Sequence, residues 1–422
     1  MKKLLTLSVV LLTSVSIYAQ TAVYDSVIMG AGYANQVWYN MTSGEVSQTP
    51  NNNWDLAFTT YFMGASAYIN SAQGVALYAI PNTDISGFAT VIDTTGYEGW
   101  QSLNNSDTTW NKGAFNQNMG NFPNYGWGTY DNVTHEVTGD SLFLVRTGMN
   151  PNYEFKKLWV IKKDVSGNWI IRSANIDNSN DVTDTILYSS YSGKNFSYYS
   201  LSNQADLNRE PLTTDWDITF ARYTANVLTT SCIPATGYFS VTGVLQNKKV
   251  VAAQADGEDF STVDFASYQS QLDSNISTIG FDWKCSGVLT ANVVYFIKSN
   301  SAEIWKVQFT EPAPTGATGK IFFMKESLAT GISPLNETIN SISVYPNPAT
   351  GNASLIVDAK KSGTASFSIF NTVGALIDNQ STYLKQGMNV IAINTESLAN
   401  GIYFINNSNE KNSEVLKLII AR

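Results

Sequence analysis

The 422-residue sequence predicts an all-β protein, and three observations lead to this prediction. Apolar and polar residues alternate with a period of two in many short segments, as half-buried strands require. Aromatic residues make up 12% of the chain and charged residues only 14%, which favours sheets joined by polar turns over a helical bundle. Long helical patterns are absent, and residues 264–272 (DFASYQSQL) are among the few short candidates.

The charge balance argues against nucleic acid as a partner. The formal net charge is −9, and the sequence shows no cluster of Lys and Arg. Phosphate binding requires such a cluster, so we expect no nucleic-acid partner.

The first residues predict export from the cytoplasm. Residues 1–19 begin with Lys2 and Lys3, continue with a mostly apolar segment and end at Ala19, as a signal peptide does. No later stretch approaches the roughly 18 consecutive apolar residues that a membrane helix needs. We therefore expect a secreted or outer-surface protein without a transmembrane segment.

Two similar phrases, WDLAFTTY (54–61) and WDITFARY (216–223), open with Trp-Asp and close with Tyr. Three further pairs follow them in the same order: FLVRT (143–147) with YFIKS (295–299), LW (158–159) with IW (304–305), and WIIRS (169–173) with IFFMK (321–325). Four ordered phrase pairs at nearly constant separations predict a duplicated β-domain, with copies at residues 20–184 and 185–328. The Trp-Asp phrase is therefore expected to be architectural rather than catalytic.

The end of the chain has a different pattern. Residues 329–340 (ATGISPLNETIN) are small and polar, and they predict a linker. Short alternating segments then recur at close intervals through residues 341–422, which predicts a small immunoglobulin-like β-sandwich.

Four motifs within residues 341–422 resemble a known sorting signal: VYPNPATG, IFNTVGALI, LANGIYFI and the basic ending KLIIAR. In this order they are similar to the type A C-terminal sorting domain of type IX secretion. The resemblance implies that the type IX secretion machinery of a Bacteroidota-type bacterium is a partner. It also implies delivery across the outer membrane.

The duplicated segment resembles the HmuY family of secreted haem-binding proteins. The resemblance lies in the two Trp-Asp phrases, each with a trailing Tyr, and in the late hairpins LFLVRTGMNPNYEFKKLWVIKK and VVYFIKSNSAEIWKVQFTE. It implies two tandem HmuY-like β-domains, with haem or a related porphyrin as the ligand.

This resemblance directs attention to His135, the only histidine in the chain. The founding haem binder holds iron between two histidines, which one molecule of this chain cannot do. Methionine replaces histidine in some relatives, so Met119 is a candidate second ligand. Trp127 and Tyr130 belong to an aromatic-rich stretch, residues 97–130, whose rings could stack on a porphyrin or a sugar.

Each of these residues also has a plainer interpretation. A single histidine in a polar turn is often solvated, methionines often fill a core, and a long loop can bury its own rings. The rival functional hypothesis is an adhesin or glycan-binding surface protein without haem. No catalytic constellation can be assembled from one histidine and no nucleophile motif, so we expect no enzymatic activity.

Cys232 and Cys285 are the only cysteines. In an oxidising compartment they predict a disulfide bond, with two free buried thiols as the alternative. A metal site would require further ligands, and the sequence singles out no set of them.

Overall fold

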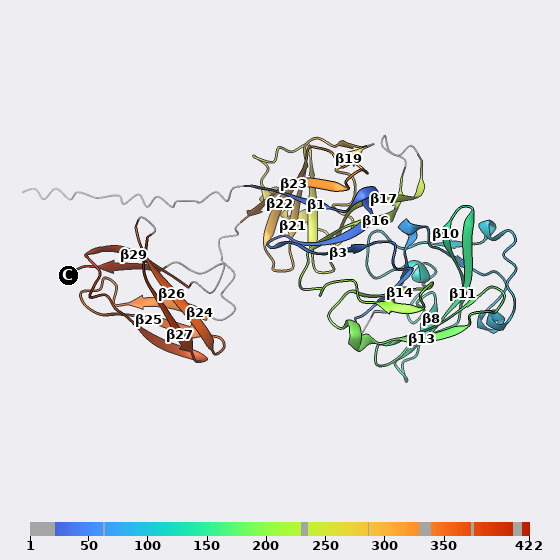
Figure 1. Cartoon of the computed structure of the whole chain (residues 1–422), viewed down its shortest axis with the longest axis horizontal. Coiled ribbons are helices and arrows are strands. Elements are labelled where there is room, and N and C mark those ends of the chain that lie inside the picture. Colours follow the sequence, from blue (N-terminus) through green and yellow to red (C-terminus); the bar gives the residue numbers. More distant parts are fainter. Residues whose placement is uncertain are drawn as a thin grey trace, which may run out of the picture. The chain divides into compact units, whose positions relative to one another are not determined.

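The computed structural model describes residues 22–61, 64–228, 235–285, 287–328, 339–372, 375–407 and 416–422. The predicted signal peptide and most of the predicted linker lie outside these residues. The chain divides into two compact units, residues 1–328 and 329–422, shown in Figure 1. Strands in both units pair in antiparallel sheets, and the longest described helix is the five-residue 3-10 helix η3 (Ile85–Ala89). The all-β prediction is therefore confirmed.

Two large antiparallel sheets form much of the described N-terminal unit. The eight-stranded sheet contains β6 (Ala76–Ala79), β7 (Ser102–Leu103), β8 (Gly128–Tyr130), β9 (Val137–Gly139), β10 (Leu142–Met149), β11 (Asn152–Lys163), β12 (Trp169–Asn175) and β13 (Val182–Ile186). The five-stranded sheet contains β1 (Val23–Ile28), β18 (Val251–Asp256), β21 (Val293–Lys298), β22 (Ile304–Thr310) and β23 (Lys320–Leu328).

Two four-stranded sheets accompany them. One contains β4 (Leu56–Thr59), β5 (Ala67–Ile69), β14 (Phe196–Ser200) and β15 (Ala205–Leu207), and the other contains β2 (Asn35–Asn40), β3 (Gly44–Pro50), β16 (Ile218–Val227) and β17 (Gly237–Gln246). The remaining elements are the pair β19 (Lys284–Cys285) and β20 (Val288–Leu289) and the 3-10 helices η1 (Ala31–Tyr33), η2 (Ser71–Gln73), η4 (Tyr97–Gly99), η5 (Ala114–Asn116), η6 (Tyr188–Tyr191), η7 (Phe265–Ser267) and η8 (Gln269–Gln271). The expected short helix at residues 264–272 is thus present as η7 and η8.

Each Trp-Asp phrase leads into a strand that pairs with a hairpin from the other half of the sequence. Strand β4 pairs with β14, so that Leu56 lies opposite Tyr199. Strand β16 pairs with β2, so that Ile218 lies opposite Tyr39 at the equivalent position. The same exchange joins β1 to β23, while β13, which crosses the expected boundary between residues 184 and 185, pairs with the preceding strand β12. The strands that open each half of the sequence are therefore exchanged between the halves.

The hydrophobic core follows this exchange. One cluster gathers buried side chains from Leu56 to Leu201, and another combines Val27 to Met41 with residues after position 217. We call residues 54–210 the first module, and residues 22–53 with 211–328 the second module. The expected boundary between residues 184 and 185 divides the sequence repeat. The packing of side chains does not follow this boundary, because β14, which comes after it, completes the first core.

The pairing of strands shows which phrases of the two modules are equivalent. It agrees with the match of WIIRS and IFFMK but not with the match of LW and IW. Ser173 of the first module lies opposite Leu158. Lys325, at the equivalent position of the second module, lies opposite Val307 rather than Ile304. The expected LW–IW match is therefore wrong by three residues, because a two-residue similarity cannot fix the register of an alternating strand.

The C-terminal unit is a β-sandwich, as predicted. Its described sheets are β24-β25-β28 and β27-β26-β29-β30. Their strands are β24 (Ile339–Tyr345), β25 (Ala353–Ala359), β26 (Gly363–Asn371), β27 (Leu376–Leu384), β28 (Gly387–Ile393), β29 (Gly401–Asn407) and β30 (Leu416–Ile420). Val357 from one sheet and Phe367 and Ile405 from the other belong to a single buried cluster. This shared core is what joins the two sheets.

Candidate functional site

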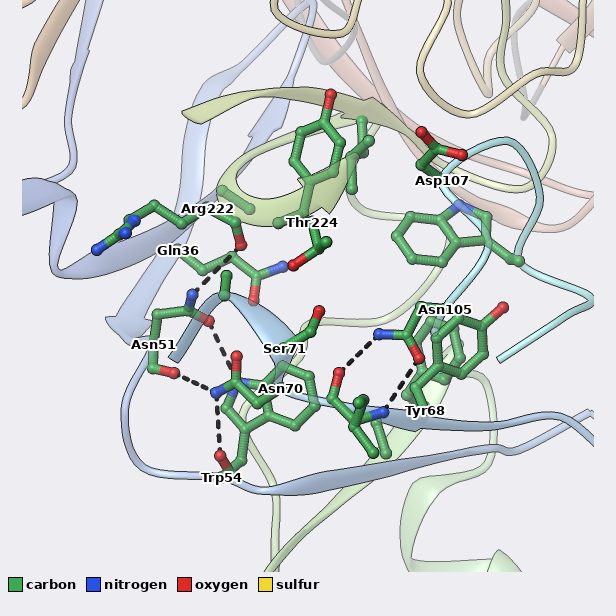
Figure 2. Close-up of a pocket in the computed structure, with 18 of the residues that line it drawn as sticks. Gln36, Asn51, Trp54, Tyr68, Asn70, Ser71, Asn105, Asp107, Arg222 and Thr224 are labelled. Carbon is green, nitrogen blue, oxygen red and sulfur yellow. Dashed lines mark hydrogen bonds between the residues drawn. The ribbon is translucent and has the colours of Figure 1, made fainter. Parts of the chain in front are cut away.

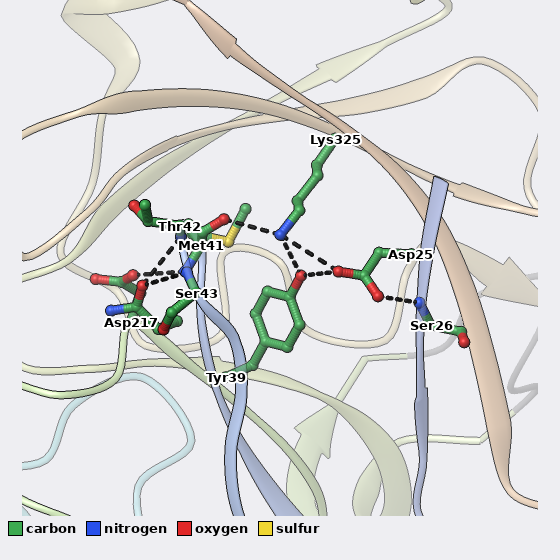
Figure 3. A network of polar contacts seen from close by, with 9 residues as sticks. Asp25, Ser26, Tyr39, Met41, Thr42, Ser43, Asp217 and Lys325 are labelled. Atoms are coloured by element: carbon green, nitrogen blue, oxygen red, sulfur yellow. Dashed lines mark hydrogen bonds and ion pairs between the residues drawn. The ribbon is translucent and has the colours of Figure 1, made fainter. Parts of the chain in front are cut away.

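The aspartates of the Trp-Asp phrases hold the exchanged strands. Asp217 accepts hydrogen bonds from the backbone N–H groups of Met41 (2.8 Å) and Asn300 (2.7 Å), as Figure 3 shows in part. Asp55 accepts one from the backbone N–H of Leu201 at 2.7 Å. Burial raises the pKa of both carboxyl groups, although these backbone donors oppose the shift. Their contacts are architectural, since each carboxylate anchors the chain just beyond an exchanged strand.

A second polar network ties β1, β2 and β23 together (Figure 3). Tyr39 Oη donates to Asp25, while Lys325 Nζ donates to Tyr39 Oη and, at 2.9 Å, to the carbonyl oxygen of Met41. Lys325 and Asp25 also form an ion pair at 3.3 Å. Partial burial acts to raise the pKa of Asp25, but hydrogen bonds from Tyr39 and Ser26 and the charge of Lys325 lower it overall. Every polar group of this network is used to hold strands together.

The first module has the same tyrosine–aspartate pair without the lysine. Tyr199 Oη donates to Asp184, as Tyr39 does to Asp25. The position of Lys325 is occupied by buried Ser173. The tyrosine–aspartate hydrogen bond is therefore a structural feature that both modules share, whereas the lysine is present only in the network of the second module.

Two of the predicted ligand-binding residues, His135 and Tyr130, line one surface hollow of about 370 Å³. Phe122, Tyr125 and Lys163 are also among its lining residues. The stretch of residues 97–130 thus contributes three aromatic side chains to one hollow.

The other two predicted residues lie elsewhere. Trp127 is fully buried in the core of the first module, and its Nε1 donates to the carbonyl oxygen of Ala65 at 2.8 Å. Met119 is 42% exposed and is not among the residues that line the hollow. Trp127 therefore packs the core, as the plainer interpretation of the sequence proposed, and it offers no face to a ligand.

The rings around the hollow are in contact with one another. Tyr130 Oη and His135 Nδ1 are hydrogen-bonded at 2.7 Å, and the ring centres of Tyr130 and Phe122 are 5.5 Å apart. His135 lies in the turn between β8 and β9 with a φ of 59°, and its backbone N–H donates to the carbonyl oxygen of Asp131 at 2.9 Å. The hydrogen bond to Tyr130 leaves His135 Nε2 as the ring nitrogen available to a ligand.

Lys163 places a buried amine beside these rings. Its Nζ donates to the carbonyl oxygens of Tyr61, at 3.0 Å, and Gly64. Burial lowers the pKa of Lys163 to about 8, although neighbouring Asp164 acts in the opposite direction. The amine is thus engaged by the backbone, and close to neutral pH it holds its proton weakly.

The hollow offers one histidine to haem iron, without a second histidine or a methionine. His135 is the only imidazole, and no methionine is among the lining residues. Within the described residues, no group of three or more His, Cys, Asp or Glu side chains is arranged to hold a metal ion. The lining therefore contains neither the second histidine that the HmuY resemblance implies nor a methionine in its place.

A smaller cavity of about 90 Å³ lies between the two modules, and the sequence did not single it out (Figure 2). Trp54, Tyr68 and Trp110 line it together with several amide side chains. Asn70 Nδ2 donates to the carbonyl oxygens of Asn51 (2.6 Å) and Trp54 (3.0 Å). Its amides therefore largely bond the surrounding backbone. Its lining residues come from segments far apart in the sequence, so no local sequence pattern could have located it.

Charged side chains are buried at the same junction. Burial raises the pKa of Glu210 to about 7 and lowers that of Lys248 to about 7, while their opposite charges partly offset both shifts. Glu210 accepts hydrogen bonds from Tyr198 Oη (3.1 Å) and the backbone N–H of Asn195 (3.2 Å). Neighbouring Arg209 donates across the junction to Pro50 and other groups of the second module. This cluster joins the modules.

Cys285 is disulfide-bonded and lies in the short strand β19. Cys232, the only other cysteine of the sequence, lies outside the described residues.

Within the described residues, no helix reaches the length and apolarity of a membrane span. No curated protein matches the sequence. A solved structure with some likeness is that of dimeric latent PorU from Porphyromonas gingivalis, which is 9% identical. The alignment covers 94% of this chain but 34% of that chain, with a TM-score of 0.18, so this chain spans about a third of the PorU chain. So weak a likeness carries no argument.

The C-terminal unit does match a family. Residues 343–421 match the secretion system C-terminal sorting domain, in agreement with the motifs quoted from the sequence. This sorting domain marks type IX cargo and implies contact with the secretion machinery. Residues 343–421 therefore belong to the secretion system C-terminal sorting domain family, and the protein is one that is exported to the cell surface or secreted.

Proposed function

We propose that this exported protein is a non-catalytic binding protein whose aromatic hollow holds a ring-shaped ligand, with a glycan as the favoured class. The observation that carries the proposal is the grouping of Phe122, Tyr125, Tyr130 and His135 around one open hollow. Phe122 is 67% exposed, although a phenyl ring on a soluble surface gains free energy when it is covered.

The chemistry of the hollow suits a sugar. The C–H face of a pyranose packs on an aromatic ring, and its hydroxyl groups need donors and acceptors at the edge of that ring. Tyr130 Oη and the imidazole of His135 are hydrogen-bonded to each other and supply such groups beside the ring of Phe122. A glycan also matches the exported location, where polysaccharides are present.

Haem is the second candidate, and His135 beside aromatic rings is the observation that favours it. His135 would hold the iron, and the neighbouring rings would pack on the porphyrin. The resemblance to HmuY proteins supports this candidate. It ranks second because the lining supplies neither a second histidine nor a methionine for the iron.

One pair of experiments separates the candidates. The full chain from residue 20 is applied to a glycan array and, in parallel, titrated with haemin while the Soret band is recorded. If the ligand is a glycan, we expect the array to retain the protein with an affinity that Tyr130→Ala lowers about tenfold. The haemin spectrum should then stay unchanged. For haem, we expect a sharp Soret shift that His135→Ala abolishes.

Tyr24→Ala is the matched control, because Tyr24 is 74% exposed and does not line the hollow. Its retention and spectra should equal those of the unaltered protein. If Tyr130→Ala and Tyr24→Ala bind every retained ligand equally well, or if neither glycans nor haemin bind, the hollow is not the functional site.

A further inference from the structure

Arg146 of the first module carries a charge that no carboxylate neutralises within the described part of the chain. Its guanidinium carbon lies 4.2 Å from the ring centre of Tyr153, and its Nη1 contacts Tyr97 Oη at 3.5 Å, the outer limit of a hydrogen bond. Its Nε is buried and has no hydrogen-bond partner among the described residues. A buried N–H without an acceptor costs free energy, and the guanidinium of Arg146 also has no carboxylate partner among the described residues.

Arg172, by contrast, has a carboxylate partner. Arg172 lies on the neighbouring part of the same sheet, in β12, and donates to both carboxylate oxygens of Asp181 at 2.8 and 2.6 Å. That fork-to-fork geometry is the usual arrangement for an arginine and a carboxylate. Arg146 has no such partner in the part of the chain that the structure describes, and it is among the residues that line a hollow.

This second hollow, of about 220 Å³, lies where the two modules meet. The first module contributes Ser71, Ser102, Asn104 and Arg146, and the second contributes Thr224 and Ser240. No carboxylate is among its lining residues, although the net charge of the chain is −9. A positive, hydroxyl-lined hollow on an acidic protein attracts a small anion selectively.

The rim adds a second cation and a ring. Arg222 Nη2 donates to Ser240 Oγ at 3.1 Å, which brings a second guanidinium to the edge of the hollow. Tyr238, which is 46% exposed, also lines it and offers a ring face. An anionic group, several hydroxyls and one ring face are the features that this lining would recognise in one molecule.

We propose that this hollow is a binding site for an acidic sugar. The guanidinium of Arg146 binds its carboxylate or sulfate group, Asn104 and the serine and threonine hydroxyls bind its ring hydroxyls, and Tyr238 covers one face. The site shares no residue with the aromatic hollow of His135, so it extends the proposed function without depending on it.

Calorimetric titration of the full chain tests this site. The acidic probes are glucuronate and N-acetylglucosamine 6-sulfate, and their neutral counterparts are glucose and N-acetylglucosamine. We expect an acidic probe to bind about tenfold more tightly than its neutral counterpart, and Arg146→Gln to remove that preference. Arg172→Gln, the matched control, should keep it. Which acidic probe binds identifies the anionic group.

The melting temperature of Arg146→Gln is recorded to check that this variant folds. A second variant tests the site independently. Ser240→Asp places a carboxylate in the hollow and should abolish binding of both acidic probes by repulsion and by pairing with Arg222, the guanidinium that Ser240 contacts. Tyr130→Ala should leave this binding unchanged, which separates the site from the aromatic hollow. The proposal is overturned if neither acidic probe binds, if neutral sugars bind equally well, or if a folded Arg146→Gln or Ser240→Asp chain retains the preference.

Discussion

Asp217 accepts a hydrogen bond from the backbone N–H of Met41 at 2.8 Å, although 176 positions separate the two residues. Met41 follows β2, the exchanged strand that pairs with β16 just after Asp217. A buried carboxylate therefore fixes the point at which one half of the sequence enters the core of the other. The equivalent contact between Asp55 and Leu201 repeats this arrangement.

Removing the Asp217 carboxylate should destabilise the second module. Asp217→Ala leaves the buried N–H groups of Met41 and Asn300 without their acceptor, so we expect the free energy of unfolding to fall by about 2–4 kcal/mol. Urea denaturation measures this change. Asp215→Ala, at an exposed position two residues earlier, is the control and should change stability by less than about 0.5 kcal/mol. Equal effects of the two substitutions would contradict the anchoring role.

The buried junction should make stability depend on pH. The pKa of Glu210 is raised to about 7 from a usual value of 4.5, so the folded protein keeps a proton that the unfolded chain has already released. The stability contributed by this group is therefore present at low pH and is lost as the pH rises to about 7. Lys248, Arg209 and Tyr198 are the ionisable groups that act on it.

Glu210→Gln should thus become more stable relative to the unaltered protein as the pH rises from 5 to 8, by roughly 1–3 kcal/mol. Urea titrations at several pH values measure this difference. Glu154→Gln, at an exposed position of β11, should show none. A constant difference between the Glu210→Gln and unaltered proteins across this range would show that Glu210 titrates normally.

Fragment boundaries should follow the exchanged packing. Residues 54–210 contain both strands of the β4–β14 pair and every residue of the main first-module core. Residues 20–184 lack β14 and β15. We expect the 54–210 fragment to yield a protease-resistant core with dispersed amide resonances, and the 20–184 fragment to be degraded. Greater resistance of the 20–184 fragment would contradict the exchange.

Trp127 should prove to be a core residue rather than a ligand contact. Trp127→Ala removes a fully buried indole and its hydrogen bond to Ala65, so we expect a loss of about 3–5 kcal/mol in unfolding free energy. Tyr130→Ala, three residues later at the hollow, should cost much less. Thermal melting compares the two variants, and similar melting temperatures would show that Trp127 does not support the core.

The sequence predicted strands and their repetition well but could not identify strand partners. Alternation in WDLAFTTY and WDITFARY indicates which residues form strands, and Leu56 and Ile218 indeed occupy equivalent positions. The hairpins that contain Tyr39 and Tyr199 offer similar strand edges, and each edge could pair with β4 or with β16. Pairing within a copy and pairing between copies therefore have the same local signature.

The same limit applies to the candidate sites. The aromatic stretch pointed to Tyr130 and the HmuY resemblance to His135, and both line one hollow, but the stretch could not separate Tyr130 from Trp127. Only packing decides which ring faces the core. Arg146 went unnoticed because the other residues that line its hollow come from distant segments, and an isolated arginine in the segment FLVRT has no distinguishing pattern.

Strand exchange also sets an order of assembly. Synthesis delivers β1 to β3 first and their partners β16 and β23 much later, so these early strands cannot complete their sheets until nearly the whole N-terminal unit exists. Residues 54–210 form one contiguous stretch whose contacts close sooner. Since long loops close at greater entropic cost and more slowly, the first module should fold early and the second should close last.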